Sequence, residues 1–271
     1  MKKSPHLASP ASGGGISSPP VKRGELEGGW HQRYLQQALW TKDLRAYIFK
    51  EIGLNKESRV LEVGCGTGAI LSQVDFPVHG LDIELASVKE AKIHTQGKSP
   101  LICADTFSLP YADASFDIVF CHFLLLWLAE PQQAIKEMMR VTRTGGHIIA
   151  FAEPDYSKRV DKPDSLAKLG QWQRDALQKQ GANTSMGAGL AELFYGAGIT
   201  IIEAGTISTS RREAMNADER ANEWETIEAD LTGIIPDENI QKMKRLDFAA
   251  WERGERVLYV PTHYLWGKNK V

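Results

Sequence analysis

The sequence predicts an α/β fold with a doubly wound, mostly parallel sheet, and three observations carry this prediction. The decapeptide RVLEVGCGTG, residues 59–68, reads as a short strand that ends in a glycine-rich turn. Further short β-prone runs alternate with helical patterns along the chain, as expected for strands joined by crossover helices. Most of these runs end in an acidic or polar residue. Ligands bind at the carboxyl ends of the strands in such sheets.

The glycine-rich turn predicts a nucleotide-binding unit. Gly64, Gly66 and Gly68 stand at alternate positions after Glu62, and the apolar run 69–71 follows them. Glycine adopts backbone conformations closed to other residues and lets a ligand approach the main chain closely. We therefore expect a strand, a turn and a helix in succession. A glycine turn of this kind can also be purely structural.

Four further strands are predicted by short apolar runs at 78–81, 100–103, 115–121 and 147–152. The polar residues at the strand ends are Glu62, Asp82, Asp105, His122 and Glu153. The step from Gly64 to Asp82 is close to the ~20 residues expected for an acid that hydrogen-bonds a ribose diol. Asp82 can also cap the helix predicted from residue 85 to 95, and Asp105 can simply begin a turn.

Helical patterns occupy most of the remaining chain. Residues 31–52 have apolar side chains at helical spacing, with Thr41 as a point of restart and Gly53 as the stop. This helix carries a dense aromatic and polar set, Arg33, Tyr34, Gln37, Trp40 and Arg45. It either packs on the sheet or covers a ligand pocket as a lid. Residues 123–128 predict a buried apolar helix, and 210–231 and 236–251 predict two charged helices.

Composition indicates an ordinary enzyme-sized chain. Its 271 residues carry a net charge of −2 and are 42% hydrophobic, so nothing favours nucleic acid as a partner. No apolar run approaches the ~20 residues of a membrane helix. Residues 1–29 are rich in Ser, Pro and Gly and predict a flexible tail. Cys65, Cys103 and Cys121 have neither metal-site nor disulfide-framework spacing, so we expect no metal and a cytoplasmic location.

Several motifs together resemble one known family. EVGCGTG, the strand-end Asp82, the pair 104–105 and the segment MMRVTRTGGHIIAFAEPDY, residues 138–156, resemble class I S-adenosylmethionine-dependent methyltransferases of small-molecule type. The group includes the quinone-biosynthesis C-methyltransferases, and the resemblance covers roughly residues 30–210. It implies a Rossmann-like, seven-stranded sheet of order 3-2-1-4-5-7-6 with strand seven antiparallel. Residues 201–208 and 255–267 suit strands six and seven.

The resemblance also implies a domain organisation. Residues 30–271 would form one methyltransferase domain after the tail. Residues 30–53 would be an N-terminal helical lid, and residues 209–253 a helical insertion between strands six and seven. Loops and insertions on such a rigid scaffold are where substrate choice usually resides.

S-adenosylmethionine is the cofactor that the resemblance implies, with a small molecule as methyl acceptor. Glu62 would lie near its methionine part, Asp82 would accept hydrogen bonds from the ribose, and Asp105 from the adenine amino group. The predicted cofactor-binding residues are Glu62, Gly64, Cys65, Gly66, Gly68, Asp82, Ile83, Asp105, Thr106 and His122. No catalytic residue is predicted. His122 is a candidate base by location and ordinary pKa, yet it can equally line the cofactor pocket.

Other users of similar turns fit the residues less well. A dinucleotide fingerprint is GxGxxG, and a pyrophosphate binds at the helix that follows it. The pattern here is ExGxGxG, and the Glu62 carboxylate would repel a pyrophosphate while favouring a cationic ligand. Aminopropyl transferases usually carry paired acids after strand four, where this chain reads CHFLLLWL. A catalytically silent cofactor-binding module stays open as an alternative.

Overall fold

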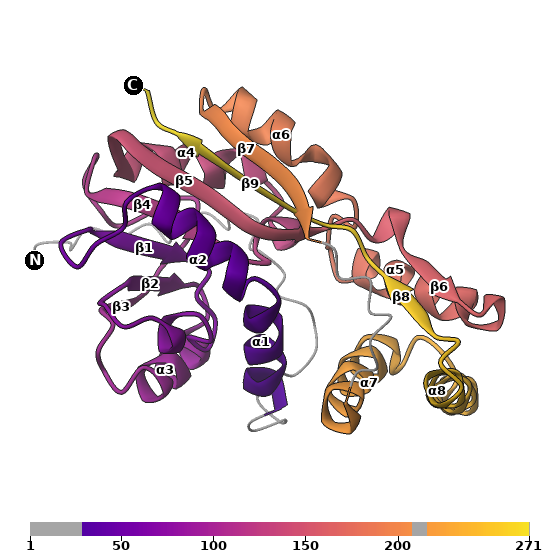
Figure 1. The fold of residues 1–271 in the computed structure, drawn as a ribbon. Helices are drawn as coiled ribbons and strands as arrows, with labels where there is room; N and C mark the ends of the chain where they lie inside the picture. Colours follow the sequence, from indigo (N-terminus) through magenta and orange to yellow (C-terminus); the bar gives the residue numbers. More distant parts are fainter. Residues whose placement is uncertain (1–28, 208–215, 271) are drawn as a thin grey trace, which may run out of the picture.

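A seven-stranded sheet forms the centre of the computed structural model, which describes residues 29–207 and 216–270 (Figure 1). Its strands are β1 (Val60–Val63), β2 (His79–Asp82), β3 (Leu101–Cys103), β4 (Phe116–Cys121), β5 (Thr142–Pro154), β7 (Thr200–Ile207) and β9 (Thr262–Lys268). Their order is β3-β2-β1-β4-β5-β9-β7, and β9 runs antiparallel to both of its neighbours. Because β7 and β9 are the sixth and seventh strands of this sheet, the predicted order is confirmed.

Helices cover both faces of the sheet (Figure 1). Helices α1 (Gly29–Trp40) and α2 (Lys42–Glu51) cover one face, and α4 (Pro131–Val141) and α6 (Met186–Gly196) cover the other. Successive strand residues point to opposite faces. Ile118 and Phe120 of β4 accordingly join the core under α1 and α2, whereas Val119 and Cys121 join the core under α4 and α6. Burial on both faces explains why these strands read as continuous apolar runs.

The predicted helix over residues 31–52 is two helices. Thr41 separates α1 from α2 and its carbonyl accepts a hydrogen bond from the Arg45 N–H at 2.8 Å. Gly53, with φ of +70°, follows the end of α2 as predicted. Arg45 and Ile48 of α2 are buried, so this helix belongs to the core.

The helix expected after the glycine turn is absent from the described residues, and that prediction was wrong. Turns lead only to a three-residue 3-10 helix, Leu71–Gln73. Residues 69–78 alone connect Gly68 to β2, and they include Pro77, which cannot donate a backbone hydrogen bond. The segment is too short and too interrupted to form a full helix and return to the sheet. Residues 123–128 likewise contain only the 3-10 helix Leu125–Trp127.

The predicted strand over residues 255–267 is also divided. Residues Val257–Tyr259 form β8, which pairs antiparallel with β6 (Val160–Lys162) in a separate two-stranded sheet. Pro261 lies at the break before β9, where its carbonyl accepts a hydrogen bond from the Asp155 N–H at 2.8 Å. Proline has no N–H to continue a ladder, so the chain changes sheets at this point.

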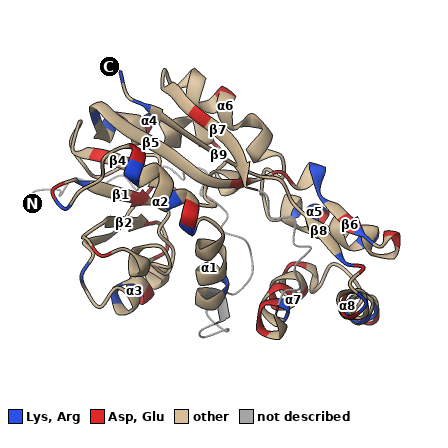
Figure 2. Cartoon of the chain, viewed as in Figure 1, with Lys and Arg blue, Asp and Glu red and all other residues tan. Residues whose placement is uncertain are grey.

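Three helices and the β6–β8 pair form a helical cap beside the sheet (Figure 1). The helices are α5 (Ala167–Lys179), α7 (Ala217–Leu231) and α8 (Asp237–Glu252). The charged residues of α7 are mainly acidic, whereas α8 carries both acidic and basic residues (Figure 2). Trp224, Ile227 and Ile240 belong to its own apolar core. The helices predicted at 210–231 and 236–251 correspond to α7 and α8, and residues 208–215 lie outside the described residues. The cap helix α5 had no counterpart in the prediction.

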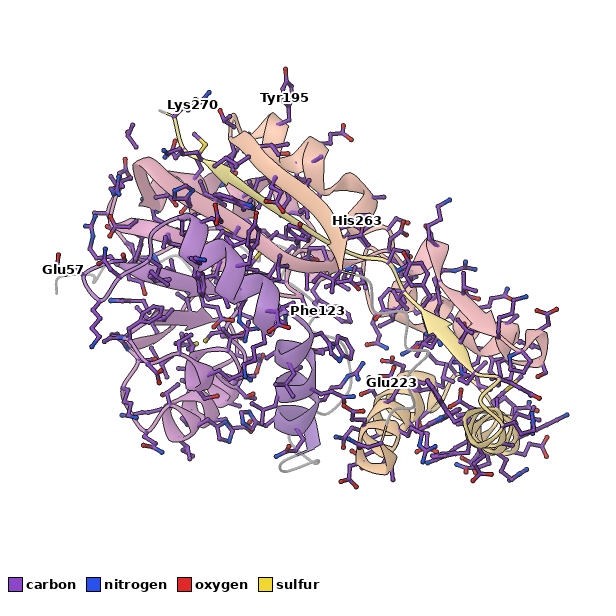
Figure 3. All side chains as sticks on the ribbon, viewed as in Figure 1. Glu57, Phe123, Tyr195, Glu223, His263 and Lys270 are labelled. Atoms are coloured by element: carbon purple, nitrogen blue, oxygen red, sulfur yellow. The ribbon has the colours of Figure 1, made fainter. Side chains whose placement is uncertain are left out.

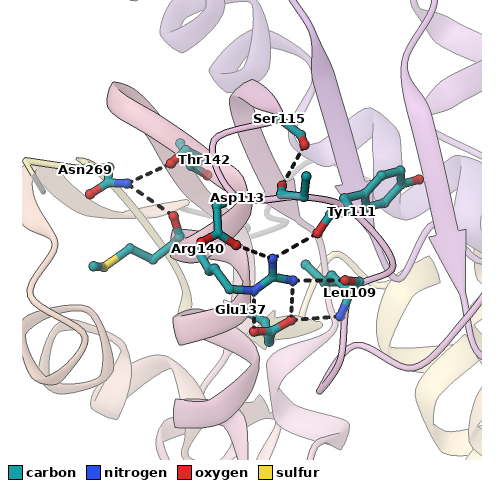
Figure 4. Close-up of polar contacts among 10 residues, drawn as sticks. Leu109, Tyr111, Asp113, Ser115, Glu137, Arg140, Thr142 and Asn269 are labelled. Atoms are coloured by element: carbon teal, nitrogen blue, oxygen red, sulfur yellow. Dashed lines mark hydrogen bonds and ion pairs between the residues drawn. The ribbon is translucent and has the colours of Figure 1, made fainter.

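The loop after β3 is anchored to α4 (Figure 4). Arg140 donates to the carbonyls of Leu109 and Tyr111, both at 2.9 Å, and pairs with Asp113 at 2.7 Å. Glu137 orients the Arg140 guanidinium and accepts the Leu109 N–H at 2.9 Å. The segment that follows the strand-end residues of β3 is therefore held in place. Among the described helices, none is long and apolar enough to cross a membrane.

Candidate functional site

A large cavity opens at the carboxyl ends of the central strands. It encloses about 220 Å³ and lies between the glycine turn, α1, and helices α5 and α7 of the cap. A smaller cavity of about 50 Å³ adjoins it toward β8. The residues that line both cavities are Arg33, Gln37, Phe123, Tyr156 and Gln173. The two cavities therefore form one chamber with a deep end at the turn and a second end under the cap.

Most of the predicted cofactor-binding residues meet in the larger cavity. Those that line it are Glu62, Gly64, Cys65, Gly66, Asp82, Ile83, Thr106 and His122. Gly68 and Asp105 do not line it. A Cβ on Gly68 would lie 3.1 Å from the Cα of Ala91, so Gly68 permits close packing against α3 (Leu85–His94). The exposed Asp105 accepts the Phe107 N–H at 2.9 Å and thereby begins a turn.

Asp82 organises the glycine turn. Its Oδ2 accepts the Gly66 N–H at 2.8 Å, and its Oδ1 accepts the Glu84 N–H at 3.0 Å. Gly64 and Gly66 have φ values of +74° and +50°, in the left-handed region that glycine tolerates. The Asp82 carboxylate thus holds the backbone of the glycine turn and of the segment that leads into α3. Asp82 also lines the cavity.

Glu62 presents a carboxylate oxygen that no other described residue satisfies. The side chain is 2% exposed and its Oε2 has no hydrogen-bond partner among the described residues. Burial raises the pKa of Glu62 to about 8, although the nearby Arg45 opposes the shift. Arg45 itself is buried and donates to the Ala38 carbonyl at 2.6 Å and to Gln73 at 2.7 Å. A buried, unsatisfied carboxylate oxygen that lines a cavity suits a ligand N–H.

His122 directly follows β4 and lies beside two buried residues, Thr41 and Arg45. Its Nε2 is 3.1 Å from the Thr41 hydroxyl oxygen. Burial, and secondarily the positive charge of Arg45, lower the pKa of His122 to about 3. A neutral imidazole of this kind is a weak base at pH 7, which favours a lining role over proton abstraction. The adjacent Phe123 has φ of +51°, an uncommon backbone conformation for a non-glycine residue.

Glu153 lies near the end of β5 and does not face the cavity rim, although its predicted position at a strand end suggested that it would. It is fully buried and accepts the N–H groups of Leu124, Leu125 and Leu126 at 3.1, 2.9 and 3.1 Å. Burial raises the pKa of Glu153 to about 7, against the opposing effect of these three N–H donors. Glu153 therefore holds the backbone of the segment whose side chains form one wall of the cavity.

Helix α1 connects the glycine turn to the cap. His31 of α1 stacks on His94 at 3.4 Å and contacts the Thr67 hydroxyl at 2.8 Å. Arg33 pairs with Glu223 of α7 at 2.5 Å and lies over the Trp40 ring at 5.1 Å. Figure 3 shows Glu223 on α7 and Phe123 beside the end of α1. Helix α1 therefore forms a wall along the whole length of the chamber.

The cap contributes polar residues that sequence reasoning missed. Asp230 of α7 accepts from the Gln173 amide at 3.0 Å and from the Gln180 amide at 3.2 Å. All three residues, together with Tyr156, line the larger cavity. Gln173 and Gln180 are seven residues apart and so share one helical face, but nothing local in the sequence joins them to Asp230.

Comparisons with known proteins agree with this geometry. The family described as "Methyltransferase domain" matches residues 61–150. Relatives include the demethylmenaquinone methyltransferase of Renibacterium salmoninarum, which is 33% identical over 43% of this chain and 51% of that protein. The malonyl-[acyl-carrier protein] O-methyltransferase of Hahella chejuensis is 31% identical over 49% and 54%. The chain contains a class I methyltransferase domain.

The resemblance noted from the motifs is thus confirmed, and solved structures confirm the fold of the domain. An S-adenosylmethionine-dependent methyltransferase from Thermotoga maritima superposes with a TM-score of 0.53 at 15% identity, over 89% of this chain and 95% of that one. The [4+2]-cyclase SpnF superposes with a TM-score of 0.54 at 21% identity, over 84% and 81%. The chain spans about half the length of the curated relatives it matches.

Proposed function

We propose that this chain transfers a methyl group from S-adenosylmethionine to a small-molecule acceptor. One observation carries the proposal: the glycine turn and the carboxylates of Glu62 and Asp82 line a single cavity within the segment that matches the methyltransferase family. Carboxylates at these positions favour a ligand that carries a sulfonium and an ammonium group.

The lining residues fit this cofactor. Asp82 would accept hydrogen bonds from the ribose hydroxyls, and the unsatisfied Oε2 of Glu62 would accept from the ammonium group. The buried Thr106 hydroxyl also lacks a partner among the described residues and would contact the adenine. Ile83, 42% exposed, would pack on the adenine face. When bound, S-adenosylmethionine supplies a methyl group that its sulfonium activates.

The chain itself would contribute orientation and exclusion of water. We propose that residues 30–53 act as a lid over the cofactor and that the insertion at 209–253 selects the acceptor. Tyr34 of α1 supports the first role, since a Cβ on Gly66 would lie 3.7 Å from its Cε2. Holding the acceptor in line with the methyl group can supply much of the rate without a strong base. The free thiols of Cys65, Cys103 and Cys121 accord with a reducing, cytoplasmic setting.

A nicotinamide cofactor suits the site less well. A pyrophosphate is normally held by the N-terminus of a helix that follows the glycine turn. Here turns and a three-residue 3-10 helix follow instead, and two carboxylates face the same space. Both features oppose an anionic ligand.

Calorimetric titration and a turnover assay test the proposal. The protein should bind S-adenosylmethionine and S-adenosylhomocysteine and bind NAD negligibly. Release of S-adenosylhomocysteine should then be followed with a broad panel of small acceptors. Tight NAD binding without a response to the sulfonium ligand would contradict the cofactor assignment. Cofactor binding with no turnover on any acceptor would indicate a non-catalytic module.

A further inference from the structure

Two acidic side chains face the chamber from α7, and their partners differ. Glu223 pairs with the Arg33 guanidinium at 2.5 Å. Asp230 instead accepts from two neutral amides, those of Gln173 and Gln180. Within residues 29–207 and 216–270, no lysine or arginine forms an ion pair with Asp230. Its carboxylate therefore has no cation at contact distance. Burial raises the pKa of Asp230, and the charge of Arg33, which lines the same cavity, opposes that shift.

The cations around Asp230 are already engaged. Arg33 of α1, whose charge acts on Asp230, pairs with Glu223. Arg159 pairs with both carboxylate oxygens of Asp161 at 2.8 and 3.1 Å. Arg256 bridges Asp161 at 2.7 Å and Asp247 at 2.5 Å. Arg159 lines the smaller cavity, but Asp161 and Gln173 hold its guanidinium, and the Arg256 pairs are almost wholly buried. Asp230 is thus an acidic group of the chamber that contacts two neutral amides and none of the described cations.

The amides also fix the direction in which Asp230 can bind. The Gln173 Oε1 accepts a hydrogen bond from Arg159, which forces its amide nitrogen toward Asp230. Gln180 donates to the other carboxylate oxygen. A carboxylate has about four lone-pair positions, and the two amides occupy only one on each oxygen. The carboxylate is therefore held in one orientation and retains capacity for further donors.

The walls beside Asp230 are aromatic and apolar. Tyr156, Trp127, Leu126 and Leu177 line the same cavity. Aromatic faces attract cations, and aliphatic walls favour an apolar ligand body. A carboxylate, aromatic rings and aliphatic walls in one pocket together match a small amphipathic amine.

We propose that Asp230, oriented by Gln173 and Gln180, binds a protonated amine of the methyl acceptor and so determines acceptor specificity. This inference rests on the proposed methyltransferase function and names its acceptor class: a small amine with an apolar body. An acceptor with a carboxylate or phosphate in the same place is repelled by Asp230 and is disfavoured.

Three probes with one body test the inference. 2-Phenylethylamine, 2-phenylethanol and phenylacetate share a phenyl ring and differ only in the polar group. Each is titrated by calorimetry into the full chain loaded with S-adenosylhomocysteine. We expect the amine to bind about tenfold or more tightly than phenylacetate, with the alcohol between them, because a charge-assisted contact replaces a repulsive one.

Two variants separate recognition from general charge effects. Asp230→Asn keeps the size of the side chain and one carbonyl oxygen for the glutamines, and it should abolish the preference for the amine while S-adenosylhomocysteine binds as before. Glu228→Gln removes the same charge from the same helix, where Glu228 pairs with Lys244 at 3.0 Å and does not line either cavity. This control should retain the wild-type ranking.

The opposite results overturn the inference. Three results would contradict it: phenylacetate binds as tightly as the amine, no probe binds, or a folded Asp230→Asn variant keeps the wild-type ranking. Asp230 would then only connect α5 to α7 by hydrogen bonds. If Asp230→Asn does not fold, the wild-type ranking decides alone. Failure of the proposed function is distinct, because the wild-type chain would then not bind S-adenosylhomocysteine at all.

Discussion

At the scale of single residues, carboxylates at neighbouring strand ends have different surroundings and different roles. Asp82 accepts two backbone N–H groups around the glycine turn. Glu153 accepts three N–H groups deep under the next loop. Glu62 keeps an oxygen without a partner among the described residues. Hydrogen-bond partners and burial, rather than residue type, therefore assign each carboxylate its role.

Asp82→Asn should weaken binding of S-adenosylhomocysteine by tenfold or more. An amide nitrogen in place of one oxygen sets a donor against the Gly66 or Glu84 N–H and removes the charge that assists contacts to a ribose. Hydrogen bonds to charged groups are worth roughly 1.5–3 kcal/mol each. Calorimetry measures the loss, and Asp75→Asn, an exposed acid outside the cavity, is the control. Equal affinities in the two folded variants would make Asp82 only a local turn residue.

Glu153→Gln should flatten part of the pH dependence of stability. The pKa of Glu153 is raised to about 7 in the folded chain, above its ordinary value of 4.5. The folded state therefore holds a proton that the unfolded state has lost, and the contribution to stability, full below pH 4.5, falls as the pH rises through 7. A glutamine does not titrate, so this slope disappears.

Denaturant unfolding at pH 5 and at pH 8 measures this effect. The difference in unfolding free energy between wild type and Glu153→Gln should change by a few kcal/mol at most, since one pKa unit corresponds to about 1.4 kcal/mol. Glu62 titrates in the same sense and remains in both proteins, so the comparison isolates Glu153. Parallel pH profiles for the two proteins would refute the assignment.

At the scale of elements, close backbone approaches set the geometry around the turn. Gly68 has φ of +79° and packs on α3, where a Cβ would lie 3.1 Å from both the Cα and the Cβ of Ala91. Gly53 has a similar φ of +70°, but a Cβ there would meet nothing within 4 Å. The two glycines therefore have similar backbone conformations, but only Gly68 is closely packed against another element.

Gly68→Ala should destabilise the chain more than Gly53→Ala. Both substitutions place an alanine in the left-handed region, at a cost of roughly 1–2 kcal/mol. Only Gly68→Ala also pushes α3 away from the turn, so its melting temperature should fall further and its cofactor affinity should fall as well. Thermal unfolding of both variants checks the order. Equal losses would mean that the contact with α3 relaxes without cost.

At the scale of the whole molecule, a buried ionic chain holds the cap together. Arg256 connects Asp161 of β6 to Asp247 of α8, and Asp247 also accepts the Trp224 indole N–H at 2.8 Å. The Trp224 ring lies in the apolar core of the cap. Residues distant in sequence therefore hold together the cap, whose helices α5 and α7 form one side of the chamber.

Arg256→Met should destabilise the protein by about 3–5 kcal/mol, because it leaves the buried Asp247 carboxylate without its cation, while Asp161 keeps Arg159. Arg253→Met is the matched control. Arg253 pairs with Glu255 at 2.9 Å with both side chains about half exposed, and such pairs contribute roughly 0–1 kcal/mol. Denaturant unfolding compares the two variants. A loss for Arg256→Met no larger than that for Arg253→Met would show that the ionic chain does not hold the cap.

Local patterns in the sequence were sufficient for the first five strands of the central sheet. Runs of apolar residues, glycine spacing and strand-end acids predicted these strands and most of the deep cavity lining. These signals are reliable because a strand buried on both faces requires apolar residues, and a turn residue with positive φ favours glycine. The family resemblance implied the strand order and the last two strands. The helix after Gly68 and the continuous strand to residue 267 failed, since connection length and the turn at Pro261 override local propensity.

The sequence by itself determined the family and most of the chamber lining at the glycine turn, because those residues follow the ends of successive predicted strands. Only the tertiary structure decided the end of the chamber under the cap. Asp230, Gln173 and Tyr156 come from three separated segments, and the buried partners that orient them come from others. No local spacing encodes which side chains meet there, because their proximity results from docking of the cap against the sheet and α1.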